Sequence, residues 1–246
     1  MRLRRAQPDD APRLLAAKTL LRVQVAPDTA AAAGRGGFLL GSTLEQYRTF
    51  IDRDLVWVLA CGNDRRTGGC REHGAGSEHA STCPGIAGFA IVLPWSTLRL
   101  HRAWNDRSSF RVTDEQALAR VENGSGPAYY EQLAVLPHGR DLAAALALRA
   151  LDSALADHDT VLATTVRRPW HNRAALPLLR AAGFVSIGEI DETYDQVGQV
   201  MSTVHLLERP QFHTASSALP PALTARLRSA GQLDVPAAAS TANHGR

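Results

Sequence analysis

Short apolar runs alternate along the chain with segments of helical spacing, and this pattern predicts strands interleaved with helices. The runs that predict strands are 2–5, 55–60, 86–93, 129–135, 161–166, 184–190 and 200–207. The segments that predict helices are 11–21, 44–51, 115–121, 142–156 and 171–182. Such alternation is typical of an α/β fold, and the hairpins among the early strands make the expected sheet mixed.

Residues suited to helix ends predict where these helices begin and end. Short polar side chains accept hydrogen bonds from the first free N–H groups of a helix, and glycine readily adopts the left-handed conformation that ends one. The expected N-caps are Asp9 or Asp10, Ser42 or Thr43, Thr113 or Asp114, and Asp141, and Gly183 is the expected C-cap.

Long connections separate some of these elements. Residues 26–37 are rich in Ala and Gly, residues 61–84 form a polar excursion within a hairpin, and residues 95–127 form a third insertion. We therefore predict one domain over 1–209 that carries insertions at about 61–84 and 95–127. The Pro-, Ala- and Ser-rich segment 210–246 is expected to be a flexible tail, with one possible helix at 221–229.

Composition narrows the class of protein. The chain has 246 residues and a net charge of +3, and Lys18 is its only lysine, an arginine bias that base composition of the genome explains best. The small positive excess and the 6% of aromatic residues argue against a nucleic-acid partner. Three cysteines argue against a disulfide framework, and no segment has the apolar length or the leader pattern of a membrane or secreted protein. A soluble, cytoplasmic protein is expected.

The excursion contains side chains that can bind zinc. These are Cys61, Cys70, His73, His79 and Cys83. Their spacing lacks paired Cys-x-x-Cys knuckles, so a polar loop is the better interpretation and no metal is expected. A metal-stabilised interaction protein remains an alternative.

The strand 129–135 is followed by a short turn and a long helix, an arrangement that can hold phosphate. Amide N–H groups at a helix N-terminus converge on one point, and the helix dipole favours negative charge there. Arg140 lies in this turn and could add a contact. Taken alone, the segment is better explained as an ordinary strand-to-helix connection.

A second segment makes the function more specific. Asn172, Ala175, Leu178, Gly183 and Phe184 have the spacing Asn-x-x-Ala-x-x-Leu-x-x-x-x-Gly-Phe. This resembles a signature segment of the GNAT superfamily of N-acetyltransferases. The strand, turn and helix at 129–156 and the start at 5–11 are similar to other parts of that family's pattern, so the resemblance covers about residues 2–207.

The resemblance implies a fold and a donor site. The fold is a mixed, mostly antiparallel twisted sheet whose central strands, about 128–135 and 160–166, splay apart, flanked by helices. Acetyl-CoA would enter the gap, and its pantetheine arm would pair with backbone near Leu133 and Val135. Its pyrophosphate would lie on the amides of His138, Gly139, Arg140, Asp141, Leu142 and Ala143, and Asn172 would help to hold the cofactor.

The resemblance also implies catalytic residues. Glu131 is the candidate base, on the face that strand alternation assigns to Tyr129, Glu131, Leu133 and Val135. Tyr129 and Tyr130 are alternative hydroxyl groups, and a solvated charge or salt bridge is the structural alternative for Glu131. Two positions depart from the family pattern. Asp141 replaces a usual glycine, and Leu179 replaces a tyrosine that serves as an acid. Tyr194 or a water would substitute for that tyrosine, or the thiolate would leave unassisted.

An acceptor pocket is expected beside the gap. Trp95, Trp104 and Tyr129 are its candidate residues. The predicted function is an acetyl-CoA-dependent N-acetyltransferase that acts on a primary amine of a small molecule or a peptide, as a monomer or homodimer. A catalytically weak relative that uses the fold for binding is the alternative.

Overall fold

The computed structural model describes residues 1–21, 42–61, 85–98, 102–123, 126–169, 171–194, 197–219 and 225. Predictions about residues 26–37, most of the 61–84 excursion and the segment after Leu219 therefore lie outside the described residues, Ala225 excepted. None of the described helices is long and apolar enough to cross a membrane.

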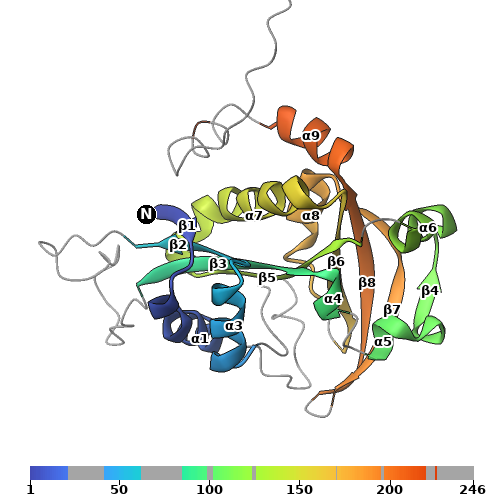
Figure 1. The fold of residues 1–246 in the computed structure, drawn as a ribbon, viewed down its shortest axis with the longest axis horizontal. Helices are drawn as coiled ribbons and strands as arrows, with labels where there is room; N and C mark the ends of the chain where they lie inside the picture. Colours follow the sequence, from blue (N-terminus) through green and yellow to red (C-terminus); the bar gives the residue numbers. More distant parts are fainter. Residues whose placement is uncertain are drawn as a thin grey trace, which may run out of the picture.

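The described strands form one eight-stranded sheet (Figure 1), in the order β1-β2-β3-β5-β6-β8-β7-β4. Every neighbouring pair is antiparallel except β5 with β6. The predicted mixed, mostly antiparallel sheet is therefore confirmed. The strands are β1 (Arg2–Arg5), β2 (Val56–Ala60), β3 (Ile86–Pro94), β4 (Phe110–Val112), β5 (Ala128–Val135), β6 (Thr160–Arg168), β7 (Val185–Tyr194) and β8 (Gly198–Glu208).

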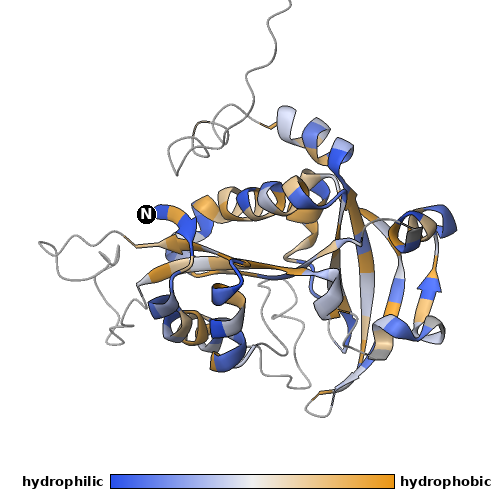
Figure 2. Cartoon of the chain, in the orientation of Figure 1, coloured by the Kyte–Doolittle hydropathy of each residue, from blue (hydrophilic) through white to orange (hydrophobic). Residues whose placement is uncertain are grey.

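Helices cover both faces of this sheet (Figure 1). On one face lie α7 (Ala143–Asp157), α8 (Leu176–Ala182) and α9 (Arg209–Ser217). On the other lie α1 (Ala11–Leu20), α3 (Leu44–Asp52) and the short helices α4 (Trp95–Leu98), α5 (Arg102–Asn105) and α6 (Glu115–Asn123). Figure 2 shows apolar residues concentrated on the strands and on α7. Two hydrophobic cores result, one on each face.

The observed helix ends match some predictions and correct others. Thr43 caps α3, since its Oγ1 accepts a hydrogen bond from the Gln46 N–H at 3.2 Å. Asp114 Oδ1 accepts from the Ala117 N–H at 2.9 Å in the first turn of α6. Gly183 ends α8 in the left-handed conformation, with φ of +96°.

The prediction that Asp141 caps α7 is wrong. Residues Pro137–Leu142 form a 3-10 helix, η3, and α7 starts only at Ala143 with no side-chain cap. Asp10 likewise makes no cap hydrogen bond to α1, because its carboxylate is engaged by the guanidinium groups of Arg4 and Arg13. Helix α8 also begins later than predicted, at Leu176, so Asn172 precedes it in an irregular segment.

Two segments expected to be connections contain regular structure. β4 pairs with β7 and extends the sheet at its edge, which the pattern of 95–127 did not predict. Helix α9 occupies the start of the predicted flexible tail. Its Phe212 is buried in the same hydrophobic core as residues of α7 and α8. The folded domain therefore continues past Arg209.

The central strands splay as predicted. β5 and β6 are paired only through Ala128 with Val161, Tyr129 with Leu162, and Tyr130 with Ala163. Beyond this point β5 stays paired with β3 and β6 stays paired with β8. β5 and β6 therefore diverge, because each stays paired with its antiparallel neighbour, and a gap opens between them in the middle of the sheet.

Gly88 lies where β3 and β5 approach each other closely, and a substitution there tests how tightly the two strands are held together. A Cβ atom at this position would lie 2.6 Å from the Ala134 carbonyl oxygen, a backbone atom that cannot move alone. We predict that Gly88→Ala lowers the free energy of unfolding by about 2 kcal/mol, the usual cost of overpacking. Urea titration measures this, with the exposed Ser186→Ala in β7 as control. Equal stability of Gly88→Ala and wild type would show that the strands separate more easily than the structure implies.

Candidate active site

A cavity of about 850 Å³ occupies the gap between β5 and β6. Its lining comes from both faces of the sheet. Ala143, Ala175 and Leu179 approach from the α7 and α8 face, and Phe50 and Trp104 approach from the α3 and α5 face. The cavity therefore passes through the sheet, and two molecules that enter from opposite faces can meet inside it.

A β-bulge places Glu131 at the start of this gap. In the register with β3, Ile91 is opposite Gln132 and Val92 is opposite Tyr130, so Glu131 has no partner. A bulge shifts the alternation of side chains by one residue. Tyr130 consequently shares a core with Leu133 and Val135, whereas Tyr129 belongs to the core on the other face. The prediction that Tyr129, Glu131, Leu133 and Val135 share one face is wrong for this reason.

The surroundings of Glu131 favour its protonated form. The residue lines the cavity and its side chain is exposed there, but the many protein atoms around this half-open cavity displace part of the water near the carboxylate. This desolvation raises the pKa of Glu131 to about 7. The negative charge of Glu192 acts in the same direction, and a hydrogen bond from Gln132 opposes it. A carboxyl group with this pKa can accept and release a proton near neutral pH.

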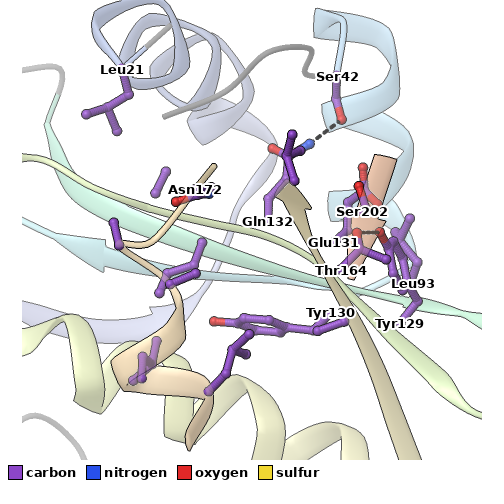
Figure 3. A pocket seen from close by; sticks show the side chains of 18 of the residues that line it. Leu21, Ser42, Leu93, Tyr129, Tyr130, Glu131, Gln132, Thr164, Asn172 and Ser202 are labelled. Carbon is purple, nitrogen blue, oxygen red and sulfur yellow. Dashed lines mark hydrogen bonds between the residues drawn. The ribbon is translucent and has the colours of Figure 1, made fainter. Parts of the chain in front are cut away.

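Two tyrosines near Glu131 hold their protons firmly. Tyr129 Oη lies 2.8 Å from Thr164 Oγ1, a hydrogen bond that spans β5 and β6 where they part (Figure 3). Burial, together with the charge of Glu131, raises the pKa of Tyr129 well above its usual range. Tyr194 is affected similarly, first by burial and then by the charge of Glu192, which accepts its hydrogen bond. Neither phenol is suited to act as a base.

A buried polar network fixes β5 on the α3 face. Gln132 is buried, and its Nε2 donates to Ser42 Oγ at 3.0 Å (Figure 3). Its Oε1 accepts a hydrogen bond of 3.2 Å from the Tyr47 hydroxyl of α3. The bulged strand is thus tied to a helix next to Glu131. The sequence analysis missed this network, because its members are far apart in the chain.

Two buried polar atoms lining the cavity have no partner among the described residues. They are the Tyr130 hydroxyl and Asn172 Oδ1. Burying a polar group without a hydrogen bond costs free energy, so such groups in a cavity fit a bound molecule that completes their bonding. Asn172 is held in place by its own N–H, which donates to the Val166 carbonyl at 2.9 Å.

The turn before α7 differs from its expected role at several residues. The Gly139 N–H donates to the Leu136 carbonyl and the Ala143 N–H donates to Arg140, so these amides are used within the turn. Gly139 is buried, and a Cβ there would lie 2.8 Å from the Ala87 carbonyl oxygen, so the glycine permits close packing on β3. His138 instead faces β2, with Nε2 3.8 Å from Cys61 Sγ. Arg140 does line the cavity.

Aromatic rings wall the side of the cavity opposite α7. Trp104 lies at their centre, with ring centroids at 5.9 Å from Trp95, 5.2 Å from Phe110 and 5.6 Å from Tyr129, all edge to face. Trp95 contacts Trp104 but does not itself line the cavity. The segment 95–127 thus supplies an apolar wall to the cavity.

The structure brings most of the predicted site residues together. Those that line the cavity are Trp104, Tyr129, Tyr130, Glu131, Leu133, Val135, Arg140, Ala143, Asn172 and Tyr194. Those that do not are Trp95, His138, Gly139, Asp141 and Leu142. Glu192 and Ser202 also line it and were missed. Strand alternation could have found Glu192, since it shares the parity of Tyr194.

The part of the chain that the structure describes contains no group of three or more His, Cys, Asp and Glu side chains able to hold a metal ion. Cys70, His73, His79 and Cys83 of the predicted excursion lie outside the described residues.

Comparison with known proteins gives similarity to solved structures only. No protein-family model and no curated protein matches the chain. The NatC complex bound to Gag peptide and CoA has a chain 14% identical, with a TM-score of 0.47, over 85% of this chain and 99% of that one. An N-acetyltransferase from Staphylococcus aureus Mu50 is 15% identical, with a TM-score of 0.44, over 84% and 96%.

A further similar structure is yncA from Salmonella typhimurium, described as a putative acetyltransferase with its cofactor acetyl-CoA. It is 15% identical, with a TM-score of 0.43, over 85% of this chain and 93% of that chain. Both of these bacterial structures are named as acetyltransferases.

The raised pKa of Glu131 predicts a pH-dependent stability. Because the folded state holds this proton more firmly than an ordinary glutamate, for which 4.5 is the reference value, the stabilising contribution is lost as the pH rises from about 4.5 through about 7. Glu131→Gln should therefore become more stable relative to wild type between pH 5 and pH 8. Urea titrations at both values measure this, with exposed Glu45→Gln as the charge-removing control. A difference that does not grow with pH would contradict the raised pKa.

Proposed function

We propose that this chain is a GNAT-type N-acetyltransferase that transfers an acetyl group from acetyl-CoA to a primary amine of a small molecule or a peptide. The observation that carries the proposal is a carboxyl group with a pKa of about 7, Glu131, at the start of a cavity that joins the two faces of the sheet where β5 and β6 diverge. The Asn172–Phe184 segment supports it independently, since its spacing resembles the family signature.

The donor would enter from the α7 and α8 face. Leu133 and Val135 line this side of the gap, on a stretch of β5 that no longer pairs with β6. Arg140 is the only arginine or lysine among the described lining residues, and it lies next to α7, where it would meet the phosphates. Asn172 Oδ1 would gain the partner that it lacks. Acetyl-CoA supplies the activated acetyl group as a thioester.

Glu131 would act as the base, directly or through a water. An ammonium acceptor must lose a proton before its nitrogen lone pair can attack the thioester carbonyl carbon, and the neutral amine loses another as the amide forms. Glu131 takes up one proton, and the other leaves through solvent. The C–N bond forms, the C–S bond breaks, and its electron pair moves to sulfur. Tyr129 and Tyr194, with their raised pKa values, would orient the acceptor by hydrogen bonds and keep their protons.

The acceptor would enter from the other face. The aromatic wall around Trp104 suits an apolar body, and the carboxylates of Glu131 and Glu192 favour a cationic amine over an anionic one. The chain would function in the cytoplasm, which the sequence composition favours, and it would act as a monomer or homodimer.

Donor binding is the first test. Calorimetry should show acetyl-CoA binding, and Arg140→Gln should weaken it by about 10-fold through loss of a charge-assisted phosphate contact. Exposed Arg48→Gln on α3 is the matched control. A wild-type protein that does not bind acetyl-CoA at millimolar concentration would overturn the proposed function.

Turnover is the second test. Thiol release is measured while a panel of small amines and peptides is supplied as acceptors. Glu131→Gln should lower kcat/KM by about 100-fold, the usual contribution of a general base. Wild-type activity should rise with pH through about 7, the pKa of Glu131, as the carboxyl group loses its proton, and this rise should be absent from the variant. An unchanged pH profile in Glu131→Gln would assign the base to another group.

A further inference from the structure

The Tyr130 hydroxyl is a buried donor that nothing in the described protein uses. The residue is only 7% exposed, it lines the cavity, and its hydroxyl has no hydrogen-bond partner. Tyr47 and Tyr129 resemble it in burial, but each has a protein partner, Gln132 and Thr164 respectively. Because an unpaired hydroxyl in a closed site costs free energy, its retention fits a hydrogen bond to a bound molecule.

The bulge decides on which side of the gap this hydroxyl lies. Tyr130 packs in the core with α7 and α8, together with Leu179, whereas Tyr129 packs in the other core with Trp104. In Figure 3 the Tyr130 ring extends away from Tyr129 and Glu131. Consecutive residues of one strand therefore serve opposite sides of the cavity.

This placement matches the two sides of an acyl transfer. The attacking nitrogen must be near the base, Glu131, and the departing sulfur belongs to the donor, which under the proposed function enters from the α7 and α8 face. We infer that the Tyr130 hydroxyl donates a hydrogen bond to the thioester sulfur and stabilises the charge that develops there as the C–S bond breaks. The inference rests on the proposed function.

The side chains that line the cavity near Tyr130 favour it as the hydrogen-bond donor to the sulfur. Leu179, a residue of α8 that belongs to the same core and lines the cavity, carries no hydroxyl and cannot donate. Burial raises the pKa of Tyr130 above its usual range, so the phenol keeps its proton and acts as a donor only. The electron pair of the broken C–S bond remains on sulfur, and the thiolate is protonated by water once the products leave. Glu131 holds the proton taken from the amine.

Tyr130→Phe removes only the hydroxyl, and it tests the inference by steady-state kinetics and acetyl-CoA binding. We expect kcat to fall by about 100-fold, as for other donors to a developing negative charge, with the Kd for acetyl-CoA within about threefold of wild type. The ring and its packing remain, so the thermal unfolding midpoint should not fall. Phe184→Leu, in the same core but not lining the cavity, is the control for altered packing.

A rescue experiment separates chemistry from packing. Leu179→Tyr in the Tyr130→Phe background returns a hydroxyl to the same side of the cavity from α8, and it should raise kcat at least tenfold above that of Tyr130→Phe alone. An isosteric donor with an oxygen ester in place of the thioester gives a second readout: its slower transfer should depend more strongly on Tyr130 than acetyl-CoA does.

The outcomes are distinguishable. A kcat of Tyr130→Phe within twofold of wild type overturns the inference and leaves the proposed function intact. A fall in acetyl-CoA affinity with unchanged kcat also overturns it, because the hydroxyl would then serve binding alone. A wild-type protein that neither binds acetyl-CoA nor acetylates any amine overturns both.

Discussion

The short parallel pairing between β5 and β6 is the constraint on which the site depends. Only residues up to Tyr130 and Ala163 are paired, and beyond them each strand is held by its antiparallel neighbour on the other side. Backbone groups that face the gap would normally complete a sheet, so side chains, water or a bound molecule must satisfy them instead. The protein lines the gap with side chains from both faces and so obtains a cavity through its own centre.

The bulge at Glu131 gives that cavity two chemically different sides. Without it, Tyr129, Glu131 and Leu133 would alternate regularly, and Tyr130 would face the same way as Gln132. With it, Tyr130 joins the α7 and α8 core, while Gln132 bonds to Tyr47 and Ser42 on the opposite face. The buried amide network holds the bulge in position, because a slip of one residue would leave these polar groups unpaired. The same bulge also places Glu131 at the entrance to the gap.

Glu131 also illustrates why a carboxyl group that lines a cavity can lower the stability of its protein. Its environment favours the neutral acid, and the negative charge of Glu192 adds to the penalty once both groups ionise. The fold tolerates this penalty because the two cores, built around α7 on one face and α1 and α3 on the other, bury many apolar side chains. The two hydrophobic cores therefore supply the stability of the fold, whereas the gap contains buried polar groups that lack hydrogen-bond partners within the part of the chain that the structure describes.

The sequence by itself determined the class of fold, the position of most strands and the segments from which the site is built. Apolar runs, helix-capping residues such as Thr43 and Gly183, and the spacing from Asn172 to Phe184 are local signals, and they led to Glu131, Asn172 and Arg140. Only the tertiary structure decided how these residues face one another. A bulge depends on the register with β3, the role of Gly139 depends on the approach of Ala87, and β4 depends on an edge offered by β7. Each of these is a contact between segments far apart in the chain, and alternation or capping along one segment carries no information about its partner.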